Sequence, residues 1–278
     1  MPKISIVSAY FNRKAELLRT LKTMEKSSFK DFEYILVDDG SDYIQRIEDL
    51  TEEFKFIKLK RIEPADKHHV NPCIPFNMGI AMAQGEIIIL QSPECMHMGD
   101  VINFVANNSI DNQYLVFACY SLSHSASNKL ENVNFNLSLE EIEDSATKTI
   151  GGFSTKNCDT SGRYDTWFAH PIYRNFCIYN FLTSMPMNAV RDLGGFDERF
   201  SDGHAFDDTD FAARVIKKKM NIKLIEKPFC LHQFHTSVLQ DIPNFRAKEI
   251  KNKKLYEDLL NSPDYKVVNS FIPIERNL

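Results

Sequence analysis

The sequence has no C-x-x-C pair among its six cysteines. Scattered cysteines of this kind predict neither a zinc site nor a dense disulfide framework, and we expect reduced thiols. The first apolar stretch, Ile4 to Phe11, ends at Asn12 and is too short for a secretory signal or a membrane-spanning helix. We therefore expect a cytoplasmic protein.

An excess of basic residues is also absent. The 278-residue chain has 33 lysines and arginines against 38 aspartates and glutamates, a net charge of -5 at pH 7. This balance argues against a nucleic-acid partner, since a protein that binds phosphate backbones needs a basic surface to displace their counterions. With 43% hydrophobic and 26% charged residues, the chain has the composition of an ordinary globular protein.

Glycine-rich phosphate loops are missing as well. No G-x-G-x-x-G occurs in the chain, which excludes a dinucleotide-dependent dehydrogenase. The segment after the first predicted strand, Ala9 to Arg13, contains no glycine. A sugar nucleotidyltransferase needs a Gly-rich basic loop there, so this class is disfavoured too.

Strands alternate with helices along the chain. Apolar stripes at helical spacing run from Leu17 to Met24 and from Ile44 to Phe54, and we expect Asn12 and Ser41 to cap these two helices. The predicted strands are residues 4–9, 32–37, 56–59, 86–90 and 114–120, and further helices are predicted at 76–83, at 101–108 and from 207. This alternation predicts an α/β fold with a mostly parallel central sheet, flanked by helices and joined by right-handed crossovers.

Two segments depart from this alternation. Residues 121–163 are polar and lack periodicity, so we expect a variable, mobile insertion over the site. Residues 245–260 place apolar residues among lysines and predict a basic amphipathic helix, which touches an anionic membrane surface or packs on the domain. We expect one domain over 1–235 and a C-terminal helical extension over 236–278.

The segment Tyr34 to Ser41 ends an apolar strand in two carboxylates, a glycine and a hydroxyl. In an open parallel sheet the carboxyl ends of strands face the ligand crevice, so Asp38 and Asp39 should be presented to a ligand. Paired acids suit a ligand rich in hydrogen-bond donors, such as a uracil ring and ribose hydroxyls. The alternative is a turn, in which Asp-Gly supplies the backbone geometry and Ser41 caps the next helix.

Four segments in this order resemble a family 2 glycosyltransferase of the GT-A fold: Ser5 to Ala9, Val37 to Ser41, Asn77 to Leu90, and Gly194 to Arg214. The most specific parts are V-D-D-G-S and G-G-F-D-E-R-F followed by D-D-x-D-F. The C-terminal segment is similar to the acceptor and base region of galactosyltransferase-type members.

The resemblance implies a catalytic domain over 1–235 that transfers a hexosyl or N-acetylhexosaminyl group with inversion. The implied donor is a nucleotide-diphosphate sugar, with a UDP-sugar as our expectation. The implied acceptor is a hydroxyl of a glycan, lipid-linked or protein acceptor.

Inversion needs a general base that takes the acceptor proton. By the resemblance this base is the second acid of a pair at the start of a helix, which is Asp208, and Asp207 binds acceptor hydroxyls or orients its neighbour. The alternative is that Asp207, Asp208 and Asp210 only stabilise the positive end of a helix dipole, by about 0.3–1 kcal/mol each. One acid would meet that need and three repel one another, so we favour a functional role.

The resemblance also implies a set of donor-binding positions at the ends of strands and in the helix after Pro75. They are Ala9, Tyr10, Asn12, Asp38, Asp39, Asn77, Gln91 and Ser92. The basic residue that usually precedes the Asn of this helix is absent. Lys67, His68 and His69 lie upstream, where they supply the missing positive charge or form a solvated loop.

The usual Asp-x-Asp after the fourth strand is replaced by the segment Gln91 to Glu94. Glu94 is the carboxylate left there to bind Mn²⁺ or Mg²⁺, which accept one or two carboxylates together with phosphate oxygens. The segment Cys230 to His235 resembles the histidine-bearing segment that closes the site in several GT-A enzymes, and we choose His232 over His235 as the second ligand. A core histidine with satisfied ring nitrogens is the alternative.

We expect Trp167, His170 and Gly195 at the acceptor site, because the apolar faces of sugars lie well on aromatic rings. A buried Trp with a core role is the alternative. The missing Asp-x-Asp also motivates a rival function, a non-catalytic member that binds nucleotide sugar or glycan without turnover. A pure binder has no need of a base, so Asp208 favours the enzyme.

Overall fold

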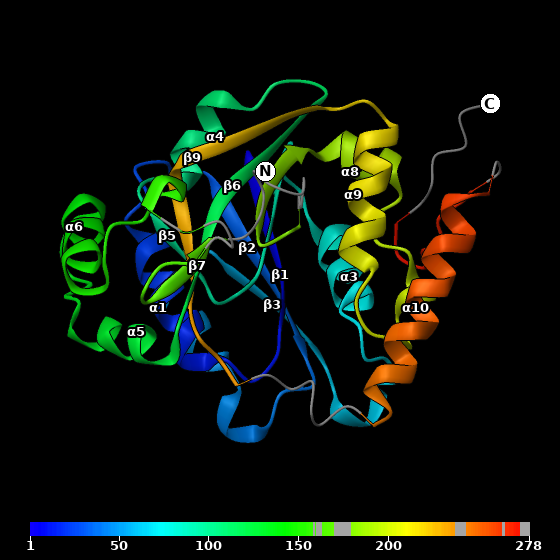
Figure 1. Cartoon of the computed structure of the whole chain (residues 1–278), viewed down its shortest axis with the longest axis horizontal. Helices are drawn as coiled ribbons and strands as arrows, with labels where there is room; N and C mark the ends of the chain where they lie inside the picture. The colour runs from blue at the N-terminus through cyan, green and yellow to red at the C-terminus, as the bar shows by residue number, and fades with distance from the viewer. Residues whose placement is uncertain (158, 160–162, 170–178, 237–242, 263–264, 273–278) are drawn as a thin grey trace.

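The computed structural model describes residues 1–157, 159, 163–169, 179–236, 243–262 and 265–272. The strands within these ranges are β1 (Ile4–Tyr10), β2 (Phe32–Asp39), β3 (Ile57–Ile62), β4 (Ile87–Gln91), β5 (Cys95–Met98), β6 (Gln113–Leu122), β7 (Trp167–Ala169), β8 (Leu182–Pro186) and β9 (Asn221–His232). They form one sheet in the order β3-β2-β1-β4-β8-β6-β9-β5, and β7 pairs with β6 (Figure 1). The first four strands in this order are parallel, whereas β8 runs antiparallel to β4 and β6.

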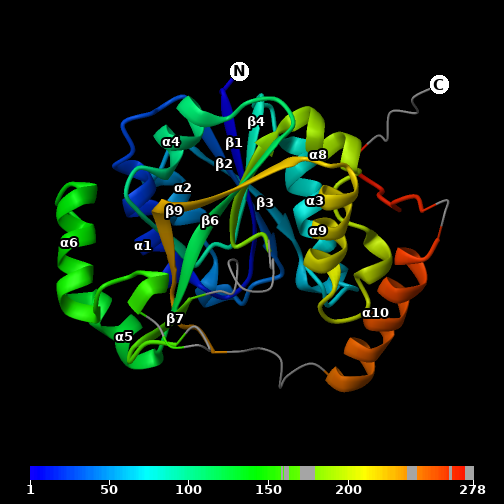
Figure 2. The same cartoon turned by 45° about the horizontal axis from the view of Figure 1, so that its top comes forward.

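Helices cover both faces of this sheet. They are α1 (Lys14–Glu25), α2 (Glu48–Glu53), α3 (Cys73–Met82), α4 (Val101–Asn108), α5 (His124–Lys129), α6 (Leu139–Ile150), α8 (Met187–Leu193), α9 (Asp207–Lys217) and α10 (Phe245–Leu260). Figures 1 and 2 show α3, α8 and α9 on one side of the sheet and α1 on the other. The predicted alternation of strands and helices around a central sheet is therefore confirmed.

The period of two along the strands explains why both faces are covered. In β4, Ile87 and Ile89 pack into the cluster that contains the apolar residues of α1, α2 and α4. Ile88 and Leu90 pack into the opposite cluster, with α3, α8 and α9. Each fully buried side chain of this size contributes about 1.5–3 kcal/mol to stability. The prediction that this strand is buried on both faces is correct.

Both predicted helix caps are wrong. α1 begins after Arg13, and the helical stretch expected after Ser41 is split into a short 3₁₀ turn and α2, which begins after Ile47. The side chains of Asn12 and Ser41 tie the two loops together instead. The Asn12 backbone N–H donates to Ser41 Oγ at 3.0 Å, and Asn12 Nδ2 donates to Asp42 Oδ2 at 2.9 Å.

Residues 121–163 were expected to lack regular structure, which is wrong for the part that the structure describes; the mobility of this segment stays a prediction. This part contains α5 and α6, and Ser138 and Glu141 form a reciprocal capping box at the start of α6. Ile142 and Ile150 are buried in a third apolar cluster against β5 and β6. Figure 1 shows α5 and α6 at the opposite side of the molecule from α10.

The described part of the C-terminal extension packs on the same side of the sheet as α3 and α9. Leu255 and Leu259 of α10 join that apolar cluster, whereas Ile250 points to solvent. After α10, the Tyr265 hydroxyl donates to Asp210 of α9 at 2.7 Å. The domain boundary at residue 235 stays a prediction. Within the described residues, every helix is too short or too polar to cross a bilayer.

We predict that Gly79→Ala destabilises the protein, because α3 packs directly on β1 at this glycine. A Cβ at position 79 would lie 2.4 Å from Val7 Cγ1, which is far inside van der Waals contact. The free energy of unfolding, measured with urea, should fall by about 1–3 kcal/mol.

Gly152→Ala is the matched control for this variant. Among the described residues, its added Cβ would meet only the Asn157 side-chain nitrogen, at 3.2 Å, so its unfolding free energy should stay close to that of the parent chain. An unchanged unfolding midpoint in Gly79→Ala would contradict the close contact between helix and strand.

Candidate active site

A cavity of about 380 Å³ lies at the edge of the sheet where the parallel strands β1, β2 and β4 end. Four of the predicted donor-binding residues line it: Ala9, Tyr10, Asp39 and Ser92. The rest of the wall comes from the loops around these strands, from α3 and from the residue two before α10: Phe11, Arg13, Lys67, His69, Val70, Pro72, Phe76, Pro93 and Pro243. The strand ends predicted to face a ligand therefore border a cavity.

Asp39 lies in this wall between two basic side chains. Its Oδ1 is 2.6 Å from His69 Nε2, and its Oδ2 is 2.8 Å from Lys67 Nζ. His69 is buried, so the solvated-loop alternative is wrong for this residue, whereas His68 is exposed. A carboxylate offers about four lone-pair sites, so Asp39 can still accept hydrogen bonds from a ligand.

Asp38 is fully buried and does not line the cavity. Its Oδ1 accepts a hydrogen bond from the Ser41 backbone N–H at 2.9 Å, and its Oδ2 lies 2.5 Å from Arg61 Nη1. Gly40 has φ +80°, the left-handed conformation that glycine adopts without strain. The turn that was the alternative for this motif is thus present, and Asp38 shapes the loop that presents Asp39.

Three other predicted donor positions have internal partners. Asn77 Nδ2 donates to the Phe196 carbonyl and Asn77 Oδ1 accepts from the Phe196 N–H, both at 2.8 Å. Gln91 Oε1 is 2.9 Å from His97 Nε2. Neither side chain lines the cavity, and each holds two segments of the fold together. Direct donor contact of these two residues stays a prediction. Asn12 is outside the lining too, because it ties the loops after β1 and β2.

Glu94 lies at the centre of a second polar group beside the cavity. Its Oε1 is 2.7 Å from Arg13 Nη1, 3.1 Å from His232 Nε2 and 3.4 Å from His235 Nε2. Burial alone would raise the pKa of Glu94, but the Arg13 charge and the hydrogen bonds from the two imidazoles hold this pKa well below its usual value. Glu94 is therefore ionised at neutral pH.

This cluster fits a divalent cation. The Glu94 Oε2 atom is buried and has no hydrogen-bond partner among the described residues. One ligand atom from each of Glu94, His232 and His235 lies within 4.8 Å of the others. Carboxylate oxygen and imidazole nitrogen are ligands that Mn²⁺ accepts. Both histidines flank Glu94, so the geometry gives His232 no preference over His235.

Asp207 and Asp208 open α9, as the sequence predicts. Asn71 Nδ2 donates to Asp207 Oδ1 at 2.8 Å, and Asn180 Nδ2 donates to Asp208 Oδ1 at 2.9 Å. Burial, together with the neighbouring Asp207 carboxylate, raises the pKa of Asp208 to about 7. Burial also raises the pKa of Asp207. A carboxylate of this basicity is suited to general base catalysis near neutral pH.

Two short connections join the acid pair to the cavity. Asn71 directly follows a residue of the cavity wall. Asn180 directly precedes Phe181, whose carbonyl accepts a hydrogen bond from the Ser92 N–H at 3.1 Å. The acid pair, the cavity and the loop after β4 are therefore neighbours, although their residues are far apart in the chain.

Two of the three predicted acceptor residues, Trp167 and Gly195, are described, and both are buried. Trp167 is 3% exposed, and its ring centroid is 4.9 Å from that of Tyr120, so the core alternative is correct. Gly195 is buried, and a Cβ there would lie 2.6 Å from Ile272 Cδ1. Both residues are thus packed against other parts of the fold, and acceptor contact of Trp167 and Gly195 stays a prediction. His170 lies outside the described residues.

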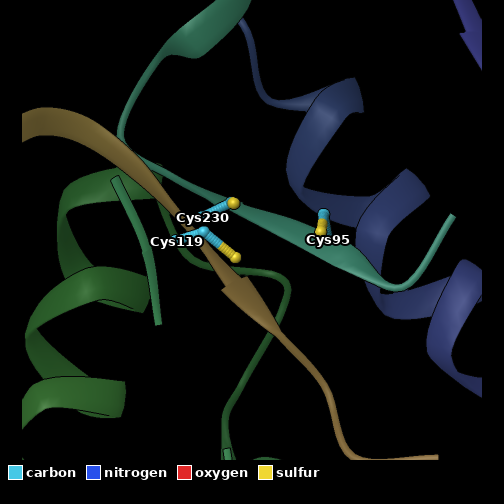
Figure 3. A group of neighbouring side chains, drawn as sticks. All are labelled: Cys95, Cys119 and Cys230. Atoms are coloured by element: carbon cyan, nitrogen blue, oxygen red, sulfur yellow. The ribbon is translucent and has the colours of Figure 1, made fainter. Parts of the chain in front are cut away.

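Three cysteines that are scattered in the sequence come together on β5, β6 and β9 (Figure 3). The sulfurs of Cys95, Cys119 and Cys230 lie within 4.8 Å of one another in the apolar core. Burial raises the pKa of all three thiols well above its usual value, and the Glu94 charge adds to this effect. Protonated, buried thiols pack as small hydrophobes, so we assign this cluster to the core.

The sequence analysis missed Arg13, Asn71 and Asn180 as site residues. Arg13 places a cation at the cavity from the loop after β1, whereas we expected the missing basic charge only upstream of Asn77. Its position directly after the first predicted strand was an available signal. Asn71 and Asn180 belong to no motif, because only the fold brings them to the acid pair.

Comparison with known proteins identifies one relative among characterised enzymes. Poly(ribitol-phosphate) beta-N-acetylglucosaminyltransferase TarP of Staphylococcus aureus (strain N315) is 29% identical over 117 residues. The match covers 40% of this chain and 35% of the relative's length. The chain thus corresponds to little more than a third of that protein.

Solved structures share the fold over most of this chain. S. aureus TarS 1-349 in complex with UDP-GlcNAc has a TM-score of 0.59 at 14% identity, over 94% of this chain and 67% of that chain. The mannosyltransferase PcManGT from Pyrobaculum calidifontis, in complex with GDP-Man and Mn²⁺, has a TM-score of 0.53 at 13% identity, over 98% and 68%. These likenesses confirm the predicted GT-A fold.

The family described as "Glycosyl transferase family 2" matches residues 5–160, more than half of the chain. The protein therefore belongs to glycosyl transferase family 2.

Proposed function

We propose that the chain is an inverting glycosyltransferase that moves a sugar from a UDP-sugar to a hydroxyl of a glycan, lipid-linked or protein acceptor. The observation that carries this proposal is Asp208, a partly buried carboxyl group with a pKa of about 7 at the start of α9. A carboxyl group whose pKa lies near neutral pH, beside a ligand-sized cavity, is suited to proton transfer. Residues 1–235 would carry this chemistry.

The cavity offers suitable groups for a nucleotide diphosphate. Asp39 would accept hydrogen bonds from the uracil N–H or the ribose hydroxyls. Arg13 and Lys67 line the same cavity and would stabilise the charge of the diphosphate. TarS was solved with UDP-GlcNAc and TarP is an N-acetylglucosaminyltransferase, which supports a UDP-sugar and an N-acetylhexosaminyl group as the first donor to test.

Proton transfer at Asp208 completes the proposed reaction. The ionised carboxylate takes the proton of the acceptor hydroxyl as its oxygen attacks the anomeric carbon from the face opposite the diphosphate. The bond between the anomeric carbon and the diphosphate oxygen breaks, and the nucleotide leaves with the bonding electrons. Asp207, held by Asn71, orients its neighbour or binds acceptor hydroxyls.

We also infer a Mn²⁺ or Mg²⁺ site formed by Glu94 with His232 or His235. When bound, the ion would supply positive charge to the leaving diphosphate. The PcManGT structure, which contains Mn²⁺, supports this inference. Arg13 already pairs with Glu94, and its guanidinium would stabilise part of the negative charge on the leaving diphosphate. Contact of α10 with a membrane and a cytoplasmic location stay predictions.

Asp208→Asn should abolish sugar transfer and leave UDP binding intact. The amide keeps the shape of the side chain and removes the base. A panel of nucleotide sugars with simple glycoside acceptors would measure transfer, and calorimetry would measure UDP affinity. Turnover at the parental rate in this variant would remove Asp208 from its role, and a chain that binds UDP but never transfers sugar would favour the non-catalytic alternative.

Asp208→Asn should also raise the melting temperature, and more at pH 8 than at pH 5. A pKa raised from 3.8 to about 7 means that the folded protein prefers the protonated carboxyl, so its contribution to stability is lost as pH rises through about 7. Thermal unfolding at the two pH values measures this difference. Equal shifts at both would contradict the raised pKa.

The acid limb of kcat should lie near pH 7, because protonated Asp208 cannot accept the acceptor proton. Asp207→Asn should move this limb to lower pH, since it removes one of the two causes that raise the pKa of Asp208. A pH profile of kcat for both chains is the measurement. If the acid limb lies at the same pH in Asp207→Asn as in the parent chain, a group other than Asp208 causes it.

Glu94→Gln should weaken Mn²⁺ binding, which electron paramagnetic resonance measures directly without turnover. His232→Asn and His235→Asn, compared one by one, should show which imidazole is the second ligand. His68→Asn, on an exposed ring, is the control and should bind Mn²⁺ as the parent chain does. Mn²⁺ affinity unchanged in Glu94→Gln would exclude this cluster as the site.

A further inference from the structure

The turn before the acid pair has an unusual backbone. Ala205 and Phe206 have φ values of 59° and 68°, so two consecutive residues with side chains adopt the left-handed conformation. Non-glycine residues rarely do so, and such a conformation persists only where the surroundings hold it. Phe206 is the residue before α9, and no side chain caps the helix there. The turn therefore needs support from elsewhere in the molecule.

Asn252 of α10 supplies this support. Its side chain is completely buried, and Nδ2 donates to the Ala205 carbonyl at 2.8 Å and to the Phe200 carbonyl at 3.0 Å. Asn71 adds a longer hydrogen bond to the same Ala205 carbonyl, at 3.4 Å. The amide of Asn252 thus bonds to both ends of the turn. One end is Ala205, three residues before the proposed base Asp208, and the other is Phe200.

Gly203 lets the amide approach this closely. A Cβ at position 203 would lie 1.9 Å from Asn252 Oδ1, so no larger residue fits without moving the amide. The Asn252 Oδ1 atom is buried and has no hydrogen-bond partner among the described residues. Burying the Asn252 oxygen without a hydrogen bond lowers stability, and the two hydrogen bonds that the same amide donates to the turn offset this cost.

Further contacts hold α10 against the same turn. The His204 N–H donates to the Lys248 carbonyl at 3.4 Å, and Lys248 Nζ donates to the Asp202 carbonyl at 2.9 Å. The ring centroids of His204 and Phe245 are 4.6 Å apart. Figures 1 and 2 show α10 alongside α9 in both views. The turn between Phe200 and α9 is therefore attached to α10 along its length.

We propose that Asn252 is a positioning residue for the general base: it holds the strained turn at Ala205 and Phe206 and thereby sets the direction in which Asp208 enters the site. The proposal rests on the proposed function, because it gives Asn252 a role in turnover through Asp208. Asn252 is not part of the cavity wall, and its side-chain amide bonds to the turn. Its loss should therefore change the chemical step and leave donor binding alone.

Asn252→Ala should lower kcat by about 100-fold, the scale expected when a catalytic group is misplaced by about 1 Å. The KM for the UDP-sugar and the affinity for UDP should stay unchanged, because Asn252 bonds to Phe200 and Ala205, whereas the proposed donor-binding residues Arg13, Asp39 and Lys67 lie on other segments. Asn261→Ala, at the residue that follows α10, is the matched control, since among the described residues its exposed amide bonds only to the Glu257 carbonyl. This control should keep the parental kcat.

Gly203→Ala tests the same contact from the other side. Its methyl group must displace the Asn252 amide, so kcat should again fall while UDP affinity is kept. In the double variant the methyl group occupies space vacated by the amide. The double variant should therefore turn over no more slowly than either single variant, whereas independent effects would multiply.

Three results would overturn the proposal: a folded Asn252→Ala chain with parental kcat, a parallel loss of kcat and UDP affinity, or multiplied losses in the double variant. Where Asn252→Ala fails to fold, Gly203→Ala decides alone, and parental kcat in that folded variant overturns the proposal. The parent chain and Asp208→Asn are assayed beside them. Failure of the proposed function would appear as no transfer by the parent chain, or as transfer by Asp208→Asn.

Discussion

The pair of adjacent carboxylates at the start of α9 is the constraint on which the rest of the site depends. Adjacent carboxylates with little access to water are unfavourable. Burial raises the pKa of both groups, and the Asp207 charge raises that of Asp208 further. The fold offsets the cost with amide donors from separate segments, Asn71 for Asp207 and Asn180 for Asp208. Because these segments meet only after the sheet has formed, the acid pair depends on the complete α/β fold.

The donor side of the site shows the opposite electrostatic design. Asp39 and Glu94 each lie between cationic or imidazole groups, and the pKa of Glu94 is held well below its usual value. Asp208 has an amide donor and an acidic neighbour, and its pKa is raised. Environments that push carboxyl pKa values apart assign different roles to one residue type. Glu94 is suited to hold positive charge, and Asp208 is suited to exchange a proton.

Local patterns predicted β1, β2, β3, β4 and β6 and the mostly parallel sheet, because strand and helix periodicities can be read from consecutive residues, but they did not predict β5, β7, β8 and β9. They also predicted which strand ends carry chemistry: Asp39 lines the cavity and Asp208 opens a helix beside it. They failed where a distant segment decides what a side chain contacts. Gly195 was assigned to the acceptor, but Ile272 covers it. Helix α6 was missed because its few buried residues are spread through a polar segment.

The same limit applies at the donor site. Asn77 and Gln91 sit in motifs that resemble donor-binding positions, yet Phe196 and His97 use their amides in the folded chain. The choice between a ligand and an internal partner depends on loops that no motif specifies. Arg13 shows the reverse, since a loop without a recognised motif brings a cation to Glu94.

A crystal structure of the chain with a UDP-sugar bound would test the central claim most directly, namely that the cavity at the strand ends and the acid pair form one site. The account predicts the nucleotide in the cavity beside Asp39, the diphosphate near Arg13 and Glu94, and the sugar directed toward Asp208. A donor bound elsewhere on the chain, or one whose anomeric carbon points away from Asp208, would contradict it.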